Sequence, residues 1–428
     1  MHSFTLKPST LSGTIKAPPS KSHTLRAILF ASMAHGTSKI RHYLKSPDTS
    51  AMIDACRQLG AITQVNGELI EITGCSGKPR LPDDVINAGN SGQVLRFIAS
   101  IAALIDGHTV LTGDHSVRFN RPMKPLMDGL THLGAHCIAT KSDGHAPLVI
   151  KGPIAPGITT LDGPDSQPVS GLLIASAFLS GTTTINVINP GEKPWVALTL
   201  TWFDRLGIPY TNDRFESYTV EGGQSIQSFD YSVPGDFSAM AYPLIAAIIT
   251  QSSLSITHID MMDAQGDKAI IEALLKMGAK ITIDNNTLTV TPGDTLIGSD
   301  IDVNAMIDAL PILAVAACFA KGTTRLLNAG IARKKESDRL STISSELKAM
   351  GASIVEHDDS LTIVGAPLHG ANLQSHHDHR IAMSLVVAGL AAHASTVVNH
   401  VACIAKSYPG FYEAMSSIGA AIEAKACT

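Results

Sequence analysis

Lysine, arginine and carboxylate side chains gather in a few short segments of this sequence, and their types suggest chemistry on a small anionic molecule. Arginine binds a carboxylate or phosphate through two parallel hydrogen bonds, whereas lysine supplies a compact charge, so a mixture suggests a ligand with more than one anionic group. Two carboxylates in the same segments, Asp308 and Glu336, are candidates for acid and base roles. The basic residues of these segments are Lys21, Arg26, Arg96, Arg121, Lys335, Arg339, Arg380 and Lys406.

These segments stand where helices are predicted to begin. The first turn of a helix exposes free backbone N–H groups and the positive end of the helix dipole, which makes it a natural anion site. One set of predicted helix starts comprises 20–26, 90–96, 165–167, 235–238, 304–308 and 378–380, and a second set comprises 118–122, 192–195, 333–339 and 406–409.

Simpler interpretations of the same residues remain open. Ser20, Asp165, Asp236 and Asp378 are residue types that commonly serve only as N-caps. The segment 333–339 could be a solvated charged face. The loop 89–92 lacks the Lys-Ser/Thr ending of a P-loop, so its glycines could serve turn geometry alone.

The segment His376-His377-Asp378-His379 suggests a metal site at first sight. Consecutive positions do not form the i, i+4 face of a zinc-binding helix, and no Cys or Glu stands near them in the sequence. We therefore expect no metal.

The elements that carry these segments belong to a repeat. A helix that ends in Leu, Met or Ile is followed by glycine and an alternating strand at six places, roughly 70 residues apart. The glycine supplies the left-handed residue that ends a helix. Each copy is predicted to contain a helix, a strand, a loop, a second helix, and two strands joined by a turn. The six glycines are 60, 134, 207, 278, 351 and 419, and the first helices are predicted at 22–34, 91–105, 167–180, 237–250, 305–320 and 379–392.

Six copies imply an α/β protein of two similar domains with three units each. A chain of 428 residues also exceeds the size at which a single core stops growing. Proline and glycine at 18–20 and 234–236 mark the seams. The predicted domains are 20–235 and 1–19 plus 236–428, with the first strand, 3–15, pairing with the second domain. The basic segments would then line a cleft between the two domains.

Composition excludes several classes of function. A net charge of −5 provides no overall field for a nucleic acid, and no apolar run reaches the length of a membrane span. No secretory signal opens the sequence. Six cysteines without a Cys-x-x-Cys pair argue against a disulfide framework. We therefore expect a cytoplasmic protein, monomeric, with no nucleic-acid or membrane partner.

Several strings in the basic segments resemble the enolpyruvyl transferases, and most closely the family that uses shikimate 3-phosphate. The resemblance covers essentially the whole chain, and the fifth and sixth strings together are highly specific. They are Pro19-Ser20-Lys21-Ser22, Gly89-Asn90-Ser91-Gly92, Asn120-Arg121-Pro122-Met123, Gly235-Asp236-Phe237-Ser238, Lys335-Glu336-Ser337-Asp338-Arg339-Leu340 and Asp378-His379-Arg380-Ile381-Ala382-Met383.

This resemblance implies a fold and a reaction. The fold is two domains of three βαβαββ units each, an inside-out α/β barrel that closes like a hinge. The reaction transfers the enolpyruvyl group of phosphoenolpyruvate to the 5-hydroxyl of shikimate 3-phosphate by addition and elimination, and releases phosphate on the route to chorismate and aromatic amino acids. It needs no organic cofactor and no metal.

The resemblance also implies roles for single residues. Asp308 would accept the hydroxyl proton, Glu336 would donate a proton to the methylene carbon, and Lys21 would assist and touch both substrates. The implied shikimate 3-phosphate site comprises Lys21, Ser22, Arg26, Ser166, Gln167, Asp308 and Lys335. The implied phosphoenolpyruvate site comprises Lys21, Asn90, Gly92, Arg121, Gln167, Arg339, Arg380 and Lys406, with Arg96, Asp236 and His379 as further candidates.

Four positions depart from the family pattern: Gln93 replaces a common Thr, Asp165 and Glu192 replace serines, and Ile331 replaces an Asn of some members. A carboxylate at 192 would repel a phosphate unless Lys193 compensates for it.

Three alternatives compete with this interpretation. The UDP-N-acetylglucosamine enolpyruvyl transferases use a reactive cysteine where this chain has Ser116, and the nearest cysteine in sequence, Cys137, lies past the second helix of that unit. A non-catalytic anion-binding protein would have no use for Asp308 and Glu336 together. An RNA-end-processing enzyme is disfavoured by the acidic balance.

Overall fold

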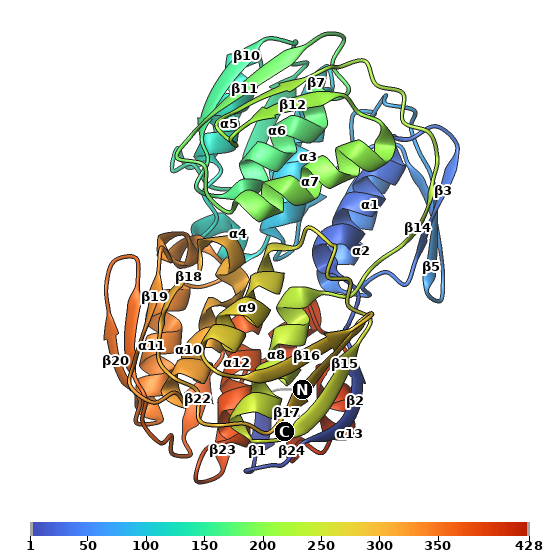
Figure 1. The fold of residues 1–428 in the computed structure, drawn as a ribbon. Helices are drawn as coiled ribbons and strands as arrows, with labels where there is room; N and C mark the ends of the chain where they lie inside the picture. The colour runs from blue at the N-terminus through green and yellow to red at the C-terminus, as the bar shows by residue number, and fades with distance from the viewer. Residues whose placement is uncertain (1–2, 426–428) are drawn as a thin grey trace. The chain divides into compact units, whose positions relative to one another are not determined.

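The computed structural model describes residues 3–425, which it divides into two compact units (Figure 1). The N-terminal unit is Pro19–Val233, and the C-terminal unit contains the described residues up to Pro18 and from Pro234. Cys427, one of the six cysteines, lies outside the described residues.

The N-terminal unit contains three four-stranded sheets among its described residues, in the orders β14-β3-β5-β4, β6-β7-β9-β8 and β10-β11-β13-β12. Its helices are α1 (Lys21–Met33), α2 (Pro47–Gln58), α3 (Gly92–Ala102), α4 (His115–Phe119), α5 (Lys124–His132), α6 (Ser166–Ser176) and α7 (Lys193–Leu206). Its strands are β3 (Thr37–Arg41), β4 (Ile62–Asn66), β5 (Leu69–Thr73), β6 (Ile86–Asn87), β7 (Gly107–Thr112), β8 (His136–Ala139), β9 (Leu148–Gly152), β10 (Ile158–Asp162), β11 (Thr183–Ile188), β12 (Tyr210–Asp213), β13 (Ser217–Val220) and β14 (Asp230–Ser232).

The C-terminal unit repeats this plan with the sheets β16-β17-β15-β2, β18-β19-β21-β20 and β22-β23-β1-β24. Its helices are α8 (Phe237–Ile249), α9 (Ala269–Lys276), α10 (Leu310–Cys318), α11 (Arg339–Ala349), α12 (His379–Leu390) and α13 (Phe411–Ser417), with 3-10 helices η1 (Gly266–Lys268), η2 (Asn304–Ala309), η3 (Gly330–Lys334) and η4 (Val401–Lys406). Its strands are β1 (Ser3–Leu6), β2 (Ser12–Lys16), β15 (Ser253–Thr257), β16 (Lys280–Asp284), β17 (Thr287–Thr291), β18 (Asp300–Asp302), β19 (Thr323–Leu327), β20 (Ser353–Glu356), β21 (Leu361–Val364), β22 (Asn372–Gln374), β23 (Thr396–Asn399) and β24 (Ile422–Lys425).

Each sheet has one design: an outer strand pairs in parallel with its neighbour, and the other pairings are antiparallel. The first helix of every copy is buried on nearly all sides, as expected of a helix that is apolar all round. In the C-terminal unit α8, α10 and α12 pack against one another, with the sheets around them (Figure 1). The predicted six-copy α/β fold is confirmed.

The glycines that were predicted to end the second helices all have positive φ angles. The values are 109° for Gly60, 104° for Gly134, 68° for Gly207, 97° for Gly278, 93° for Gly351 and 99° for Gly419. A residue with a Cβ is strained in this region, which explains why glycine recurs there.

The leading strands of the two units are exchanged. β2 directly precedes α1 in the chain but pairs with β15 of the C-terminal unit, whereas β14 directly precedes α8 but pairs with β3 of the N-terminal unit. The predicted single strand over 3–15 is therefore wrong in detail: it is two strands, and β1 pairs separately with β23 and β24. Pro8, which has no N–H group to donate, lies between the two strands.

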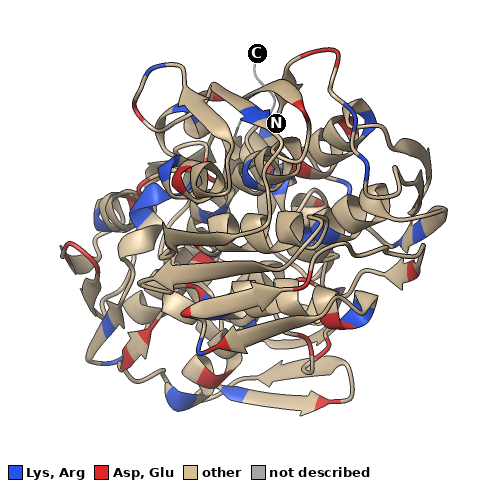
Figure 2. Ribbon diagram, turned by 90° about the horizontal axis from the view of Figure 1, so that it is seen from above, with Lys and Arg blue, Asp and Glu red and all other residues tan. Residues whose placement is uncertain are grey.

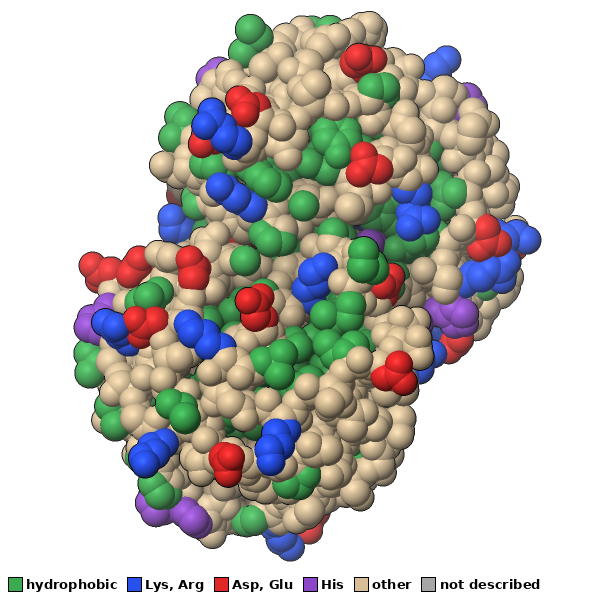
Figure 3. All heavy atoms as spheres, in the orientation of Figure 1, with side chains coloured by type: hydrophobic (Ala, Val, Ile, Leu, Met, Phe, Trp, Pro, Cys, Tyr) green, Lys and Arg blue, Asp and Glu red, His purple; other side chains and the backbone are tan. Residues whose placement is uncertain are grey.

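Charged side chains are distributed over many elements. In Figure 2 the Lys and Arg segments and the Asp and Glu segments are both scattered over the ribbon, and on the face drawn in Figure 3 most basic side chains lie singly or beside acidic ones. No helix within residues 3–425 has the length and apolar character needed to cross a membrane.

Candidate active site

The guanidinium group of Arg339, the first residue of α11, is the centre of the polar site in the C-terminal unit. Its Nη1 donates to Asp308 Oδ1 at 2.7 Å, its Nη2 to Glu336 Oε2 at 2.7 Å, and its Nε to Asp378 Oδ2 at 2.8 Å. The residue is only 1% exposed. Burial alone would lower the pKa of Arg339, but the three carboxylates outweigh it and hold this pKa well above its usual value.

Two more basic residues complete this group. Arg380 Nη2 donates to Asp308 Oδ2 at 3.0 Å, and Lys406 Nζ donates to Glu336 Oε1 at 2.6 Å. Each of the two candidate acid–base residues therefore bridges two cations. We call Asp308, Glu336, Arg339, Asp378, Arg380 and Lys406 the Arg339 cluster.

Asp308 reaches Arg339 because the first helix of the fifth copy of the repeat does not begin as an α-helix. The segment 304–309 is the 3-10 helix η2, with a kink at Met306, and α10 begins at Leu310. Pro311 has no N–H group and therefore fits the first turn of a helix rather than its interior. The predicted helix 305–320 is wrong at its start, and Asp308 lies in η2, where its side chain is 26% exposed.

Asp378 belongs to the Arg339 cluster and also caps α12. Its Oδ1 accepts from the Arg380 N–H at 2.9 Å, and its Oδ2 accepts from the Ser337 hydroxyl at 3.1 Å. The capping role predicted for such residues is correct, and Ser20, Asp165 and Asp236 likewise cap α1, α6 and α8. Capping and site-building are therefore compatible functions of one carboxylate.

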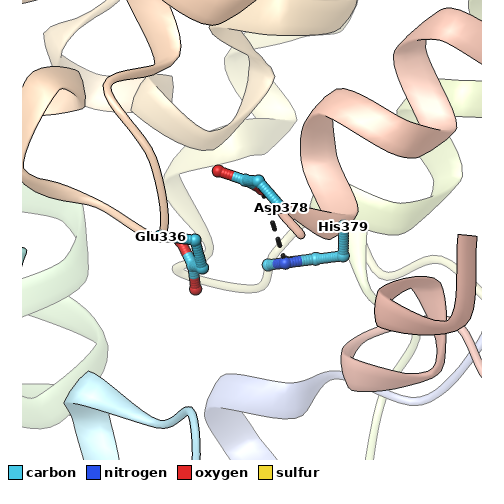
Figure 4. Close-up of side chains that lie close together, drawn as sticks. All are labelled: Glu336, Asp378 and His379. Carbon is cyan, nitrogen blue, oxygen red and sulfur yellow. Dashed lines mark ion pairs between the residues drawn. The ribbon is translucent and has the colours of Figure 1, made fainter. Parts of the chain in front are cut away.

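Figure 4 shows Glu336 and Asp378 close to His379, with a 3.6 Å ion-pair contact between the His379 ring and Asp378. Ligand atoms of these three residues lie within 4.8 Å of one another. Sequence reasoning found no Glu beside His379, because Glu336 is distant along the chain. Both carboxylates already accept from Arg339, so this arrangement favours ion pairing over metal binding.

The N-terminal unit brings a second group together between the first turns of α3 and α6. Arg96 Nη1 donates to Gln167 Oε1 at 2.7 Å, and its Nη2 lies 3.1 Å from Asp165 Oδ2. A Cβ on Gly92 would lie 3.0 Å from Arg96 Nη1 and 3.3 Å from Arg121 Nη1. Glycine at 92 thus lets two guanidinium groups and an amide approach the backbone. Arg121 lies in the loop between α4 and α5, not at the predicted helix start.

The first two turns of α1 carry Lys21, Ser22 and Arg26. Lys21 Nζ lies 3.6 Å from Asp48 Oδ2. Arg26 donates to the Thr199 hydroxyl, the Ser22 carbonyl and the Trp195 carbonyl, at 3.0–3.2 Å. All three acceptors are uncharged, and burial lowers the pKa of Arg26 to about 9. An anionic ligand would supply the counter-charge that these acceptors lack.

Glu192 lies close to the predicted phosphate contact Ser166. Its Oε2 accepts from both the Ser166 N–H and the Ser166 hydroxyl at 2.9 Å, and the residue is 2% exposed. Lys193, expected to offset this carboxylate, instead places its Nζ over the Phe215 ring, 5.9 Å from the centroid. The protein's own carboxylate therefore binds the first turn of α6.

The remaining predicted site residues lie near these groups. Asn90 Nδ2 donates to Asp114 and Ser116, Gln93 and Lys335 are buried, and Lys406 is the last residue of η4 rather than a helix start. Ile331 lies in η3, partly buried against the core of the C-terminal unit.

Sequence reasoning missed two carboxylates. Asp48 is the second residue of α2 and pairs with Lys21, while Asp267 lies in η1, buried beside the Arg339 cluster. Neither belongs to a predicted start segment with basic residues, so the repeat gave no signal for them.

Comparison with known proteins identifies the family. A family model described as EPSP synthase (3-phosphoshikimate 1-carboxyvinyltransferase) matches residues 6–415. The chain belongs to the EPSP synthase family. A member from Ruminiclostridium cellulolyticum is 42% identical, over 97% of this chain and 98% of its own, and one from Methanocella arvoryzae is 44% identical, over 96% and 97%. Both are named 3-phosphoshikimate 1-carboxyvinyltransferase.

A solved EPSP synthase structure agrees with this assignment. The enzyme from Acinetobacter baumannii superimposes with a TM-score of 0.84, at 27% identity and over 99% of both chains. The EPSP synthase family therefore accounts for both three-unit halves of the chain. The resemblance drawn from the Lys335–Leu340 and Asp378–Met383 strings is confirmed.

Proposed function

We propose that this chain is a 3-phosphoshikimate 1-carboxyvinyltransferase. It transfers the enolpyruvyl group of phosphoenolpyruvate to the 5-hydroxyl of shikimate 3-phosphate and yields 5-enolpyruvylshikimate 3-phosphate and phosphate. Membership of the EPSP synthase family over residues 6–415 is the observation that carries the proposal. The Arg339 cluster supports it, because two carboxylates held between cations suit the proton transfers of an addition–elimination reaction.

Asp308 is the proposed general base. It takes the proton of the 5-hydroxyl as that oxygen attacks C2 of phosphoenolpyruvate. Arg339 and Arg380 each hold one oxygen of Asp308, so the carboxylate is fixed in orientation. The anionic groups of phosphoenolpyruvate would bind the same guanidinium groups and compete with Asp308 for their donors.

Glu336 and Lys406 are proposed to act as a pair. Glu336 accepts from both Arg339 and Lys406, so a proton for the methylene carbon must first reach its carboxyl group. The Lys406 ammonium, 2.6 Å from Glu336 Oε1, is the source we propose. In the elimination step the methyl group returns a proton to Glu336, the C–O bond to phosphate breaks with its electron pair on the phosphate oxygen, and the proton that Asp308 took from the hydroxyl passes to the departing phosphate.

The N-terminal unit is proposed to bind the acceptor and part of phosphoenolpyruvate. Ser22, Arg26, Ser166 and Gln167 would hold shikimate 3-phosphate together with Lys335, and Asn90, Gly92 and Arg121 would hold phosphoenolpyruvate, with Arg96, Asp236 and His379 as supporting residues. Lys21 would contact both substrates. Arg26, whose acceptors are all neutral, and the Gly92–Arg96–Arg121 group support this assignment.

Two domains are proposed to close on the substrates like a hinge, because the proposed site residues are divided between them. The domains are 20–235 and 1–19 plus 236–428. We also propose that the protein is a cytoplasmic monomer. A reducing compartment fits its free thiols, which are those of Cys56, Cys75, Cys137, Cys318 and Cys403.

Phosphate release tests the function. The purified protein with phosphoenolpyruvate and shikimate 3-phosphate should release inorganic phosphate between about pH 6 and about pH 9. UDP-N-acetylglucosamine in place of shikimate 3-phosphate should give none. Release only with the UDP-sugar would overturn the proposed acceptor.

A further inference from the structure

A buried carboxyl group of the C-terminal unit has no part in the proposed reaction. Asp267 lies in η1, is 0% exposed, and neither of its side-chain oxygens has a well-formed hydrogen bond. Gln265 fixes η1 against the start of α8, since it accepts from the Phe237 N–H at 3.1 Å and donates to the Gly235 carbonyl at 2.9 Å. Asp267 is therefore held in place by its backbone rather than by partners of its side chain.

The charged neighbours of Asp267 come from three elements. Asp308 of η2 and Asp236, the N-cap of α8, are acidic, and Arg380 of α12 is basic. The Ser238 hydroxyl of α8 lies nearby without the geometry of a formed hydrogen bond. α9 presents the exposed Glu272 in its first turn, and the adjacent Lys268 donates to backbone carbonyls of Met261 and Asp263.

These surroundings favour the uncharged acid. Burial, followed by the charge of Asp308, raises the pKa of Asp267 to about 8, against smaller opposing effects of Arg380 and Ser238. Asp267 thus carries a proton at neutral pH and loses it at a mildly alkaline pH.

Arg380 has matching unused donors. Its Nη2 binds Asp308, but its buried Nε and Nη1 have no hydrogen-bond partner among the described residues. The Tyr242 hydroxyl lies beside this guanidinium without a formed hydrogen bond. A buried donor without a partner lowers the stability of the folded protein, so these two N–H groups of Arg380 favour the binding of an additional anion.

We propose that Asp267 is a positioning residue that controls whether Arg380 is available to phosphoenolpyruvate. With its proton, Asp267 leaves the Arg380 N–H groups open to the substrate. Without it, the carboxylate attracts these N–H groups and adds a negative charge beside Asp308 and Asp236. The identity of the anion rests on the proposed function, whereas the relation between Asp267 and Arg380 does not.

The proposal has a specific kinetic consequence. Above about pH 8, binding of phosphoenolpyruvate must be accompanied by proton uptake, so its KM should rise by up to about tenfold per pH unit. The KM for shikimate 3-phosphate should lack this added rise. At saturating phosphoenolpyruvate kcat should be less affected, because bound substrate keeps Asp267 protonated.

Asp267→Asn, which is permanently uncharged, tests this directly. The KM for phosphoenolpyruvate is measured from pH 7 to pH 9.5 for wild type, for D267N and for the control D294N, which changes an exposed aspartate of the same unit. D267N should remove most of the alkaline rise seen in wild type and D294N. Equal pH profiles for wild type and D267N would overturn the proposal.

Calorimetry on the wild type provides a test that does not depend on how D267N folds. Titration with phosphoenolpyruvate at about pH 8.5, in buffers of different ionisation enthalpy, should show net uptake of a fraction of a proton. No uptake would contradict the proposal.

If wild type releases no phosphate from the two substrates at pH 7, the proposed function fails by itself. Inorganic phosphate then replaces phosphoenolpyruvate as the titrant. The affinity for inorganic phosphate should fall more steeply between pH 8 and 9.5 for wild type than for D267N. An equal fall in affinity for the two proteins would contradict the Asp267 proposal.

Discussion

Arg339 shows how one side chain can organise several others. Three carboxylates accept from its guanidinium group, and two of them, Asp308 and Glu336, also accept from Arg380 or Lys406. Removing one partner from a buried arrangement of this kind leaves an uncompensated charge, so substitutions within it affect both the site and stability. The choice of replacement therefore decides what an experiment measures.

Asp308→Asn keeps the shape of the proposed base and removes its charge. We expect kcat to fall by about 10²- to 10⁴-fold, because the hydroxyl proton loses its acceptor. Binding of shikimate 3-phosphate, measured by calorimetry, should persist. Unchanged turnover would remove Asp308 from the mechanism, and lost binding together with a lower melting temperature would point to a structural role.

Glu192 is a second residue with a testable electrostatic effect. Its carboxylate occupies the N–H and hydroxyl of Ser166, where the acceptor phosphate is proposed to bind. Glu192→Gln should lower the KM for shikimate 3-phosphate by roughly five- to tenfold, because it removes a repulsive charge. Glu221→Gln changes an exposed glutamate of the same unit and should leave that KM unchanged. A higher KM in E192Q would show that the charge helps binding.

At the scale of elements, the sequence predicts what depends on local conformation. Gly60 and its equivalents end helices because the chain there needs a positive φ angle, and Asp378 is identifiable as a cap from its residue type. The predicted start of the first helix in the fifth copy is wrong. Pro311 favours an α-helix that begins at Leu310, and Asp308 therefore lies in a kinked 3-10 helix.

The contacts that sequence reasoning missed join residues far apart in the chain. Lys21 pairs with Asp48 of the next helix, and Glu192 binds Ser166 across two elements. No local spacing encodes such pairs, because they depend on how separate elements pack. The sequence predicts which polar residues lie at helix starts. It does not predict which other side chains of the protein those residues contact.

Asp378 allows the capping and ion-pair roles of one residue to be separated. Asp378→Asn retains a good cap but loses the charge beside Arg339, whereas Asp378→Ala loses both. We expect D378A to lower the free energy of unfolding by about 3–5 kcal/mol and D378N to lower it by less. Denaturant unfolding measures this, with Ser46→Ala as a cap-only control of about 1 kcal/mol. Equal losses in D378N and D378A would show that asparagine preserves no cap here.

For the whole molecule, the hinge proposal predicts a change in size. The radius of gyration from X-ray scattering should decrease when shikimate 3-phosphate and phosphoenolpyruvate are both present, since the site residues are divided between two units. D308N serves as a control in which turnover is slow and the complex persists. Identical scattering profiles with and without substrates would contradict domain closure.

Asp267 also couples global stability to pH. Its pKa is about 8 in the folded protein against an ordinary value of 3.8, so between these pH values the folded state holds a proton that the unfolded chain has lost. The free energy of unfolding must then fall as pH rises through this window, and no further above it. D267N should therefore gain several degrees in melting temperature relative to wild type between pH 5 and pH 8. A constant difference across this range would contradict the linkage.

The exchange of leading strands has a consequence for the order in which the protein is made. β1 and β2 leave the ribosome before the other described strands, yet their partners β15, β23 and β24 belong to the later half of the described chain. The earliest strands must wait unpaired while Pro19–Val233 is synthesised and can already begin to fold. A deletion of the first residues should accordingly damage the late-made half of the protein, and nascent chains should acquire protease resistance in the middle of the sequence before either end.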